Sequence, residues 1–252
     1  MKNKLKKIVK EYISEYQSDS DIKSSWREPL LEFAAADDPL FEDFKKIISP
    51  SHVLPEDILS GAKTVLAYFI PFSKEIVNSN LTGEYSSREW AVAYVETNQL
   101  IADLNQHLKK KLAEKGWQVS SIPATHHFDK ERLISDWSHR HAAYAAGLAK
   151  FGINNMLITE KGCAGRVGTL ITDLKIEPSQ PIDKELCLNK AGENCQKCVD
   201  NCVNDSLKVD SFARFKCYEQ LLKNDQFFSE LGLTDVCGKC SVGLPCSFRA
   251  PL

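Results

Sequence analysis

Apolar residues recur every three or four positions at the start of the chain. These positions are Leu5, Ile8, Val9, Tyr12 and Ile13. The spacing places them on one face of a helix, so the sequence predicts an amphipathic opening helix that packs on the protein body. The rest of residues 1–60 is expected to be mainly helical, with loops at 37–39 and 49–51.

A different pattern, a continuous apolar run, occupies residues 64–70 and stops at Pro71. A run without polar alternation predicts a strand in a sheet that is covered on both faces. Residues 88–115 carry the longest helical pattern, which Lys115-Gly116 ends. The pattern also predicts strands at 117–123, 155–159 and 169–176 and an alanine-rich helix at 136–150.

Strands that alternate with helices indicate an α/β layer fold. After residue 180 the periodic pattern gives way to loops that carry cysteines. The 252 residues suffice for a full core and a smaller second part. We therefore expect an α/β core over 1–180, with a candidate cofactor or substrate cleft, and a small module over 181–252, with the boundary at 177–181.

Charge and hydropathy narrow the partners and the compartment. The formal net charge is −2 with both signs mixed, which gives no electrostatic case for DNA, although a local basic groove for a folded RNA is compatible with it. No apolar run reaches the ~20 residues of a membrane helix, and the lysine-rich N-terminus lacks the apolar segment of a signal peptide. The sequence predicts a cytoplasmic protein that binds neither DNA nor membranes.

The strongest chemical signal is a group of eight cysteines between Cys187 and Cys246. Cys-x2-Cys steps let two thiolates from one turn reach the same metal centre, and a [4Fe–4S] cube takes four cysteines. In two-cluster ferredoxins the last cysteine of each run ligates the other cluster, and this crossed order predicts two cubes. The first quartet is Cys187, Cys195, Cys198 and Cys246, and the second quartet is Cys202, Cys217, Cys237 and Cys240.

Two other uses of these cysteines fit less well. Cys195-x2-Cys198 and Cys237-x2-Cys240 match a four-thiolate zinc site, but such a site would leave the other four without a role. A disulfide framework is typical of small secreted chains, whereas this chain is long and shows no secretion signal. Seven residues separate Cys187 from Cys195, and five separate Cys240 from Cys246. Cys187 and Cys246 therefore depart most from the compact ferredoxin spacing.

A glycine-rich segment, Lys161-Gly162-Cys163-Ala164-Gly165-Arg166-Val167-Gly168, lies between two of the expected strands. Glycines at three-residue spacing allow positive φ and close backbone approach to a ligand, and Arg166 adds a cation suited to phosphate or carboxylate. The candidate cofactor-binding residues are Gly162, Cys163, Gly165, Arg166 and Gly168. The alternatives are a flexible β-hairpin and, for the ninth cysteine Cys163, a buried apolar thiol or a reactive nucleophile.

A second candidate segment, Asp136-Trp137-Ser138-His139-Arg140-His141, precedes the run Ala142-Ala143-Tyr144. Asp136 or Ser138 could cap the helix expected there. Alternatively, the segment supplies a proton donor or a pocket wall. His126-His127 could in principle bind a metal, but adjacent histidines in a strand point to opposite faces, which argues against a shared ion.

Several segments resemble the epoxyqueuosine reductase group, which is in turn similar to reductive dehalogenases. The matching segments are Ser60-Gly61-Ala62-Lys63-Thr64-Val65, Ala142-Ala143-Tyr144-Ala145-Ala146-Gly147-Leu148, Phe151-Gly152-Ile153-Asn154-Asn155-Met156-Leu157-Ile158-Thr159, the strand end Thr172-Asp173, and the cysteine groups. The resemblance covers roughly residues 50–247. The register of the group's catalytic aspartate falls on Leu133, three residues before Asp136. The chain is expected to be a short relative without the helical-repeat extension for tRNA.

The resemblance implies a nitroreductase-like α/β core followed by a small two-cluster ferredoxin-like module, with a cobalamin between them. It implies that two [4Fe–4S] cubes reduce the corrinoid, which removes an epoxide oxygen from a modified tRNA base in queuosine biosynthesis. The electrons would come from a flavodoxin- or ferredoxin-type donor.

These observations favour a cytoplasmic iron–sulfur oxidoreductase that acts on tRNA or on a small-molecule substrate. Asp136 is the first candidate for a proton donor, with His139 and Tyr144 behind it. Two alternatives stay open: a non-catalytic electron-transfer or corrinoid-handling partner of another enzyme, and a zinc-stabilised binding protein.

Overall fold

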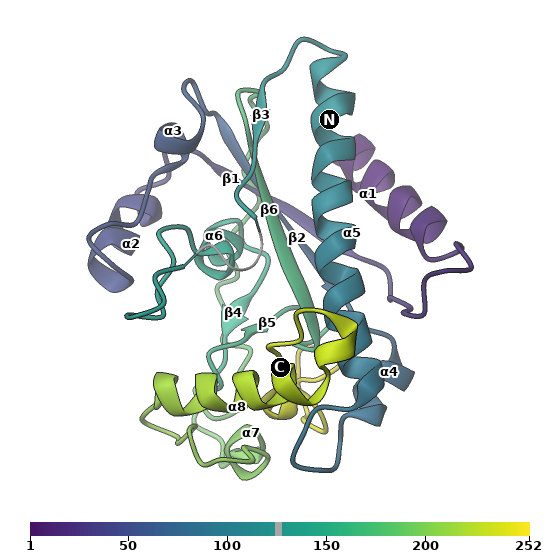
Figure 1. The fold of residues 1–252 in the computed structure, drawn as a ribbon. Coiled ribbons are helices and arrows are strands. Elements are labelled where there is room, and N and C mark those ends of the chain that lie inside the picture. Colours follow the sequence, from purple (N-terminus) through teal and green to yellow (C-terminus); the bar gives the residue numbers. More distant parts are fainter. Residues whose placement is uncertain (124–127) are drawn as a thin grey trace.

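The computed structural model describes residues 1–123 and 128–252. Its centre is a four-stranded antiparallel sheet in the order β1-β2-β6-β3 (Figure 1). These strands are β1 (Leu30–Ala35), β2 (Thr64–Pro71), β3 (Val119–Ser120) and β6 (Gly165–Thr172). Every residue of β2 is buried, as predicted for a strand that is covered on both faces.

Helices and one small second sheet complete the described part of the chain. The longer helices are α1 (Lys2–Tyr16), α2 (Leu40–Ile47), α5 (Arg88–Ala113) and α8 (Arg214–Phe227). The shorter ones are α3 (Pro55–Ile58), α4 (Lys74–Ser79), α6 (His139–Ala145), α7 (Lys197–Asp200), η1 (Ser229–Leu231) and η2 (Lys239–Ser241). Strands β4 (Lys150–Phe151) and β5 (Leu157–Ile158) pair with each other.

The central sheet lies between two helical layers because its side chains alternate between faces. On one face Leu66, Tyr68 and Ile70 of β2 pack with residues of α1 and α5. On the other face Val65, Ala67 and Phe69 pack with residues of α2 and α6. Figure 1 shows α1 and α5 on one side of the sheet and α2, α3 and α6 on the other. The predicted α/β layer fold is confirmed.

Some element boundaries differ from the predictions. The opening helix and the helix over 88–115 are confirmed as α1 and α5, and the strand over 64–70 as β2. The expectation that residues 1–60 are mainly helical was wrong at β1, which pairs along its whole length with β2. The helix expected over 136–150 is limited to α6, and the strand expected over 169–176 begins earlier, as β6. Pairing with β2 accounts for the early start, since Gly165 lies opposite Pro71.

The cysteine-rich segment packs at one end of the sheet, next to α4 and the β4-β5 pair (Figure 1). Its small apolar cluster joins Leu186, Leu207 and Leu244 to Ile158 and Cys163. Arg27 ties this end of the molecule together by donating hydrogen bonds to three backbone carbonyls, those of Phe72, Phe248 and Lys161 at 2.9, 3.0 and 2.7 Å. The division into a core over 1–180 and a module over 181–252 stays a prediction.

Two sequence expectations concern single segments. His126 and His127 lie outside the described residues. Within residues 1–123 and 128–252, no helix is long and apolar enough to cross a membrane.

Candidate functional site

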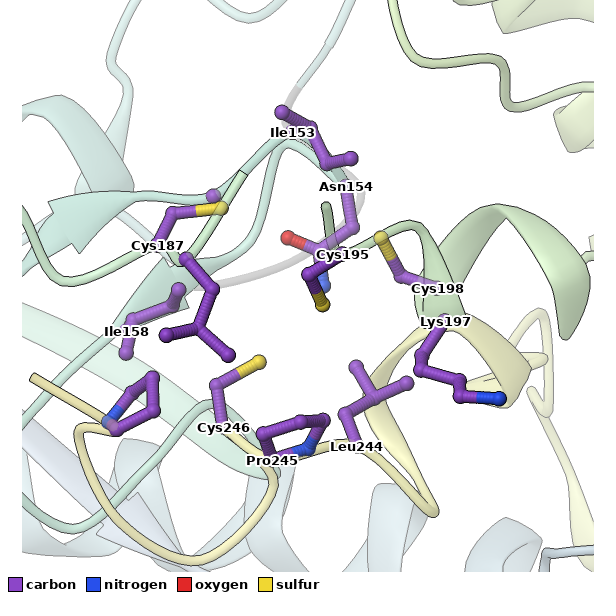
Figure 2. Close-up of a pocket in the computed structure, with 13 residues that line it drawn as sticks. Ile153, Asn154, Ile158, Cys187, Cys195, Lys197, Cys198, Leu244, Pro245 and Cys246 are labelled. Carbon is purple, nitrogen blue, oxygen red and sulfur yellow. The ribbon is translucent and has the colours of Figure 1, made fainter. Parts of the chain in front are cut away.

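Each predicted quartet of cysteines surrounds its own cavity. The small cavity is bordered by all four cysteines of the first quartet, and their sulfur atoms point toward a common space (Figure 2). Apolar side chains such as Ile153, Ile158 and Leu244 form the rest of this wall. Residues more than 50 positions apart in the sequence are therefore brought together as the crossed order predicted.

The large cavity, of about 1460 Å³, is bordered by all four cysteines of the second quartet. Its other walls come from the central sheet and the helices around it, including Phe69, Trp90, Tyr94 and Trp137. Cys163 and Asn154 also border it, and Asn154 borders the small cavity as well. The Asn154 side chain donates to the Cys240 carbonyl at 2.7 Å, so this one residue forms part of the wall between the cavities.

The thiols of the first quartet are deeply enclosed. Burial, together with the nearby sulfurs of Cys246 and Cys187, raises the pKa of Cys198 to about 12. The ninth cysteine, Cys163, lies beside this quartet and its S–H points to the Cys246 sulfur, 4.0 Å away. This hydrogen bond lowers the pKa of Cys246 and raises the pKa of Cys163 well above its usual range.

The thiols of the second quartet show the same crowding. Burial and the nearby Cys237 and Cys217 raise the pKa of Cys240 to about 12. Burial also raises the pKa of Cys217 and of Cys237. At Cys202, burial raises the pKa, but hydrogen bonds from Ser206 and from backbone N–H groups outweigh it and lower the pKa overall.

Crowded, buried thiols suit polynuclear metal chemistry. Four thiolates in one enclosed space repel each other and lose hydration, so they need a compensating positive centre. In the part of the chain that the structure describes, no group of three or more His, Cys, Asp or Glu side chains is arranged to hold a single metal ion. The sulfurs of each quartet border one cavity, and four cysteines are the donor set that one [4Fe–4S] cube takes. Their role as ligands stays a prediction.

The glycines of the segment 161–168 are placed by their protein neighbours. A Cβ on Gly162, whose φ is +88°, would lie 2.3 Å from the Ser247 carbonyl oxygen, and a Cβ on Gly168 would lie 2.3 Å from the Tyr68 ring. Neither of these two glycines borders the large cavity, whereas Cys163, Gly165 and Arg166 do. Packing therefore explains Gly162 and Gly168, and the segment leads into β6 and is not a free hairpin.

Arg166 is held at the cavity wall by its neighbours. Its guanidinium lies 4.4 Å from the centre of the Tyr94 ring, and Nη2 donates to Asn98 Oδ1 at 2.7 Å. Its Nε and the indole Nε1 of Trp90 are buried, and neither has a hydrogen-bond partner within the described residues. Both side chains border the large cavity with other atoms, while these two nitrogens are covered by protein.

Two of the three catalytic candidates lie away from the cavity wall. Asp136 is exposed and its Oδ1 accepts a hydrogen bond from Ser51 Oγ at 2.6 Å. Ser138 is the residue that caps α6, by accepting from the His141 N–H. Tyr144 packs on Phe151 with ring centres 6.0 Å apart. Neither Asp136 nor Tyr144 is among the residues that border the cavity, which differs from the expectation of a proton donor in a cleft.

His139 does border the cavity, and its tautomer follows from its partners. The Pro123 carbonyl, 3.1 Å from Nε2, can only accept, so Nε2 carries the proton. Nδ1 then accepts from Thr169 Oγ1 at 2.8 Å, while the same hydroxyl accepts from Trp137 Nε1 at 3.0 Å. Of the three catalytic candidates predicted from the sequence, His139 is the one that borders the cavity.

Sequence reasoning missed two cations near the second quartet. Arg140 borders the cavity; burial lowers its pKa, while the nearby Cys240 and Cys217 raise it. Lys239 is 3% exposed; burial lowers its pKa, and the neighbouring Cys237 raises it. The only available sequence signal was position: Lys239 lies inside the Cys237-x2-Cys240 step.

Comparison with known proteins also points to similarity with epoxyqueuosine reductases. No protein-family model matches the chain. The epoxyqueuosine reductase of Bacillus anthracis is 28% identical to it over 187 residues, which are 70% of this chain and 44% of that protein. The chain therefore spans less than half the length of the curated relative that it matches.

Solved structures with the same fold come from two groups of enzymes. Epoxyqueuosine reductase from Streptococcus thermophilus matches with a TM-score of 0.57 at 18% identity, over 95% of this chain and 67% of the other. The enzyme from Bacillus subtilis, solved with its aspartate-bearing catalytic loop swung out of the active site, gives 0.59 at 18%, over 96% and 66%. The reductive dehalogenase NpRdhA gives 0.58 at 15%, over 88% and 30%. The fold of this chain is thus the fold of epoxyqueuosine reductases and reductive dehalogenases, as its sequence resemblance predicted.

Proposed function

We propose that this chain is a cytoplasmic iron–sulfur oxidoreductase similar to epoxyqueuosine reductases. Each quartet would hold one [4Fe–4S] cluster, and electrons from a flavodoxin- or ferredoxin-type donor would pass through both clusters to the large cavity. The observation that carries the proposal is the convergence of the two quartets on two cavities that share Asn154. Clusters on either side of this shared wall would pass electrons from one cavity to the other.

The large cavity is suited to a bulky cofactor, and we propose a corrinoid. Its volume of about 1460 Å³ exceeds the ~300–1,000 Å³ of ordinary small-molecule sites. Aromatic walls and the Arg166 side chain fit a large ring that carries polar substituents. One of the reductive dehalogenase relatives is described as B12-dependent. A corrinoid held there would supply the reducing chemistry for removal of an oxygen or a halogen from a substrate.

The proposed substrate is an epoxyqueuosine-modified tRNA, since one epoxyqueuosine reductase with this fold has been solved with such a tRNA stem loop. Within the cavity, His139 is the proposed proton donor, and its Nε2–H would exchange the Pro123 carbonyl for the substrate when it donates. Its ring is fixed by Thr169 and Pro123, and it borders the space that a substrate would enter. Arg166 and Gly165 would contact the cofactor from the start of β6.

A second candidate function is a non-catalytic electron carrier or corrinoid-handling partner. The positions of Asp136 and Tyr144 away from the cavity wall favour it, because they reduce the number of proton donors next to a substrate. Corrinoid occupancy and turnover together separate the two functions. A chain that retains cobalamin and turns over substrate supports catalysis, a chain that retains cobalamin without turnover supports the corrinoid-handling partner, and a chain that retains clusters alone supports the carrier.

The test is anaerobic purification of the full chain followed by iron, sulfide, cobalt and zinc analysis. Two cubes predict about eight irons and eight sulfides per chain. A zinc-stabilised binding protein predicts full zinc occupancy and four irons or fewer. Turnover is then measured on an epoxyqueuosine-containing tRNA stem loop with reduced flavodoxin as the donor.

A further inference from the structure

Lys239 is a buried lysine within the loop that carries two cysteines of the second quartet. It lies between Cys237 and Cys240, begins η2, and borders the large cavity at 3% exposure. Its backbone N–H donates to the Cys237 sulfur. Its backbone is therefore fixed beside the Cys237 sulfur, and its side chain is buried at the same cavity.

Within the described residues, the hydrogen-bond partners of the Lys239 ammonium are neutral. Nζ donates to the backbone carbonyls of Asn80 at 3.0 Å and Thr82 at 2.5 Å. Among residues 1–123 and 128–252, no carboxylate forms an ion pair with it. A buried charge with no counter-charge is costly. The negative charge that Lys239 does experience comes from Cys237.

Arg140 provides a second positive charge at the same quartet. It borders the same large cavity as Cys240 and Cys217, and its side chain is exposed there. Its Nη1 donates to the Asn155 carbonyl at 2.6 Å, which again is a neutral partner. Two cations from distant parts of the sequence, one buried and one exposed, thus lie at the cavity of one quartet.

The first quartet has a different environment. The Cys198 thiol is affected by burial and by the sulfurs of Cys246 and Cys187. The small cavity is bordered by apolar side chains and by Lys197, which is exposed to solvent. Water and salt screen an exposed charge far more strongly than a buried one.

We propose that Lys239, together with Arg140, gives the cluster of the second quartet the higher reduction potential. This inference rests on the proposed function. Reduction of a cube adds one electron and one negative charge without breaking a bond, and a nearby buried cation stabilises that charge. A one-electron donor of the flavodoxin or ferredoxin class is oxidised in this step. Electrons that enter at the first quartet then move to the large cavity with a favourable change in free energy.

A redox titration of the reconstituted full chain, followed by EPR spectroscopy, tests this assignment. The variants are Lys239→Met, which removes the buried charge, Lys239→Arg, which keeps it, and the matched control Lys197→Met. We expect two one-electron steps in the wild type. Lys239→Met should lower the equilibrium constant of the higher-potential step at least tenfold, which is 59 mV for one electron. Lys239→Arg should stay near wild type, and Lys197→Met should move neither step.

Arg140→Gln provides an independent variant in case Lys239→Met fails to fold or loses iron. It should lower the same higher-potential step. The inference is overturned if Lys239→Met and Arg140→Gln, at full iron content, leave both potentials unchanged. It is also overturned if these two variants shift only the lower-potential step. Failure of the proposed function gives a different result, because the wild-type chain would then bind fewer than two clusters and show no two-step titration.

Discussion

Cys163 and Cys246 lie with their sulfur atoms 4.0 Å apart, and Cys163 is the hydrogen-bond donor. Only Cys246 belongs to a predicted quartet. Because the hydrogen bond keeps Cys163 protonated and leaves Cys246 the better thiolate, the pair separates a metal ligand from a neighbouring thiol that supports it.

Replacement of Cys163 by alanine should therefore leave the iron content unchanged, whereas Cys198→Ala should remove about half of the iron. The reason is that a cube loses stability when one of its four thiolates is removed. Iron and sulfide analysis after anaerobic reconstitution gives the result. Loss of iron in Cys163→Ala together with full iron in Cys187→Ala would contradict the assignment of the first quartet.

Substitution of Gly162 by alanine should destabilise the protein through packing. The new Cβ would meet the backbone of Ser247 in addition to the strain of φ +88°. Overpacking of this kind costs ~1–3 kcal/mol beyond the backbone term. Gly116→Ala is the matched control, because Gly116 has a φ of +84° and no atom within 4 Å of its Cβ position. The free energy of unfolding is measured with urea under argon. An equal decrease in the two variants would show that glycine is needed at position 162 for its φ alone.

His139→Gln should slow the reduction of epoxyqueuosine-containing tRNA by ~10²–10⁴-fold, the usual effect of losing a general acid. Asp136→Asn should remain within about threefold of wild type, because this carboxylate is exposed and bonded to Ser51. Both variants should keep full iron content. A large loss of rate in Asp136→Asn and none in His139→Gln would reverse the two roles. The loop that carries Asp136 would then have to move toward the large cavity.

His141 should make the folded state less stable at mildly acidic pH. Burial, with a contribution from Arg140, lowers the pKa of His141 to about 4. Between its unfolded pKa of ~6.5 and about 4, the unfolded chain binds the proton more strongly, so stability falls as the pH falls. Partial contact with solvent limits the expected loss to ~1–2 kcal/mol.

The measurement for this prediction is thermal unfolding of the reconstituted protein at pH 7 and pH 5. His141→Gln should show a smaller difference between the two midpoints than the wild type. An unchanged difference would mean that other groups, such as the thiols, control the acid sensitivity.

The local pattern of apolar residues was sufficient to predict those helices and strands whose burial follows from their own sequence. The apolar run of β2 and the periodic face of α5 each predict their own burial. β1 could not be found this way, because Leu30–Ala35 contains good helix formers and becomes a strand by pairing with β2. Tertiary pairing overrides local propensity in such cases.

The candidate site was predictable where covalent spacing limits the geometry. Short Cys-x2-Cys steps force Cys195 toward Cys198 and Cys237 toward Cys240, and the crossed order of two-cluster ferredoxins assigned the other four cysteines to the cavities that they border. The places of Gly162, Gly168 and Asp136 depend on neighbours across the fold, namely Ser247, Tyr68 and Ser51, and no local pattern encodes such contacts. The burial of Lys239 was not predictable from sequence, because its ammonium is bonded to backbone carbonyls of a distant loop.

Arg27 also connects regions that the sequence keeps far apart. It holds the Phe248 carbonyl, two residues beyond Cys246, to the end of β2 and to the residue before Gly162. Free energy released when a cluster binds Cys246 is then shared with the N-terminal half of the molecule through thermodynamic linkage. Assembly of the cluster and consolidation of the central sheet are therefore expected to be cooperative, so that loss of iron would loosen regions that contain no cysteine.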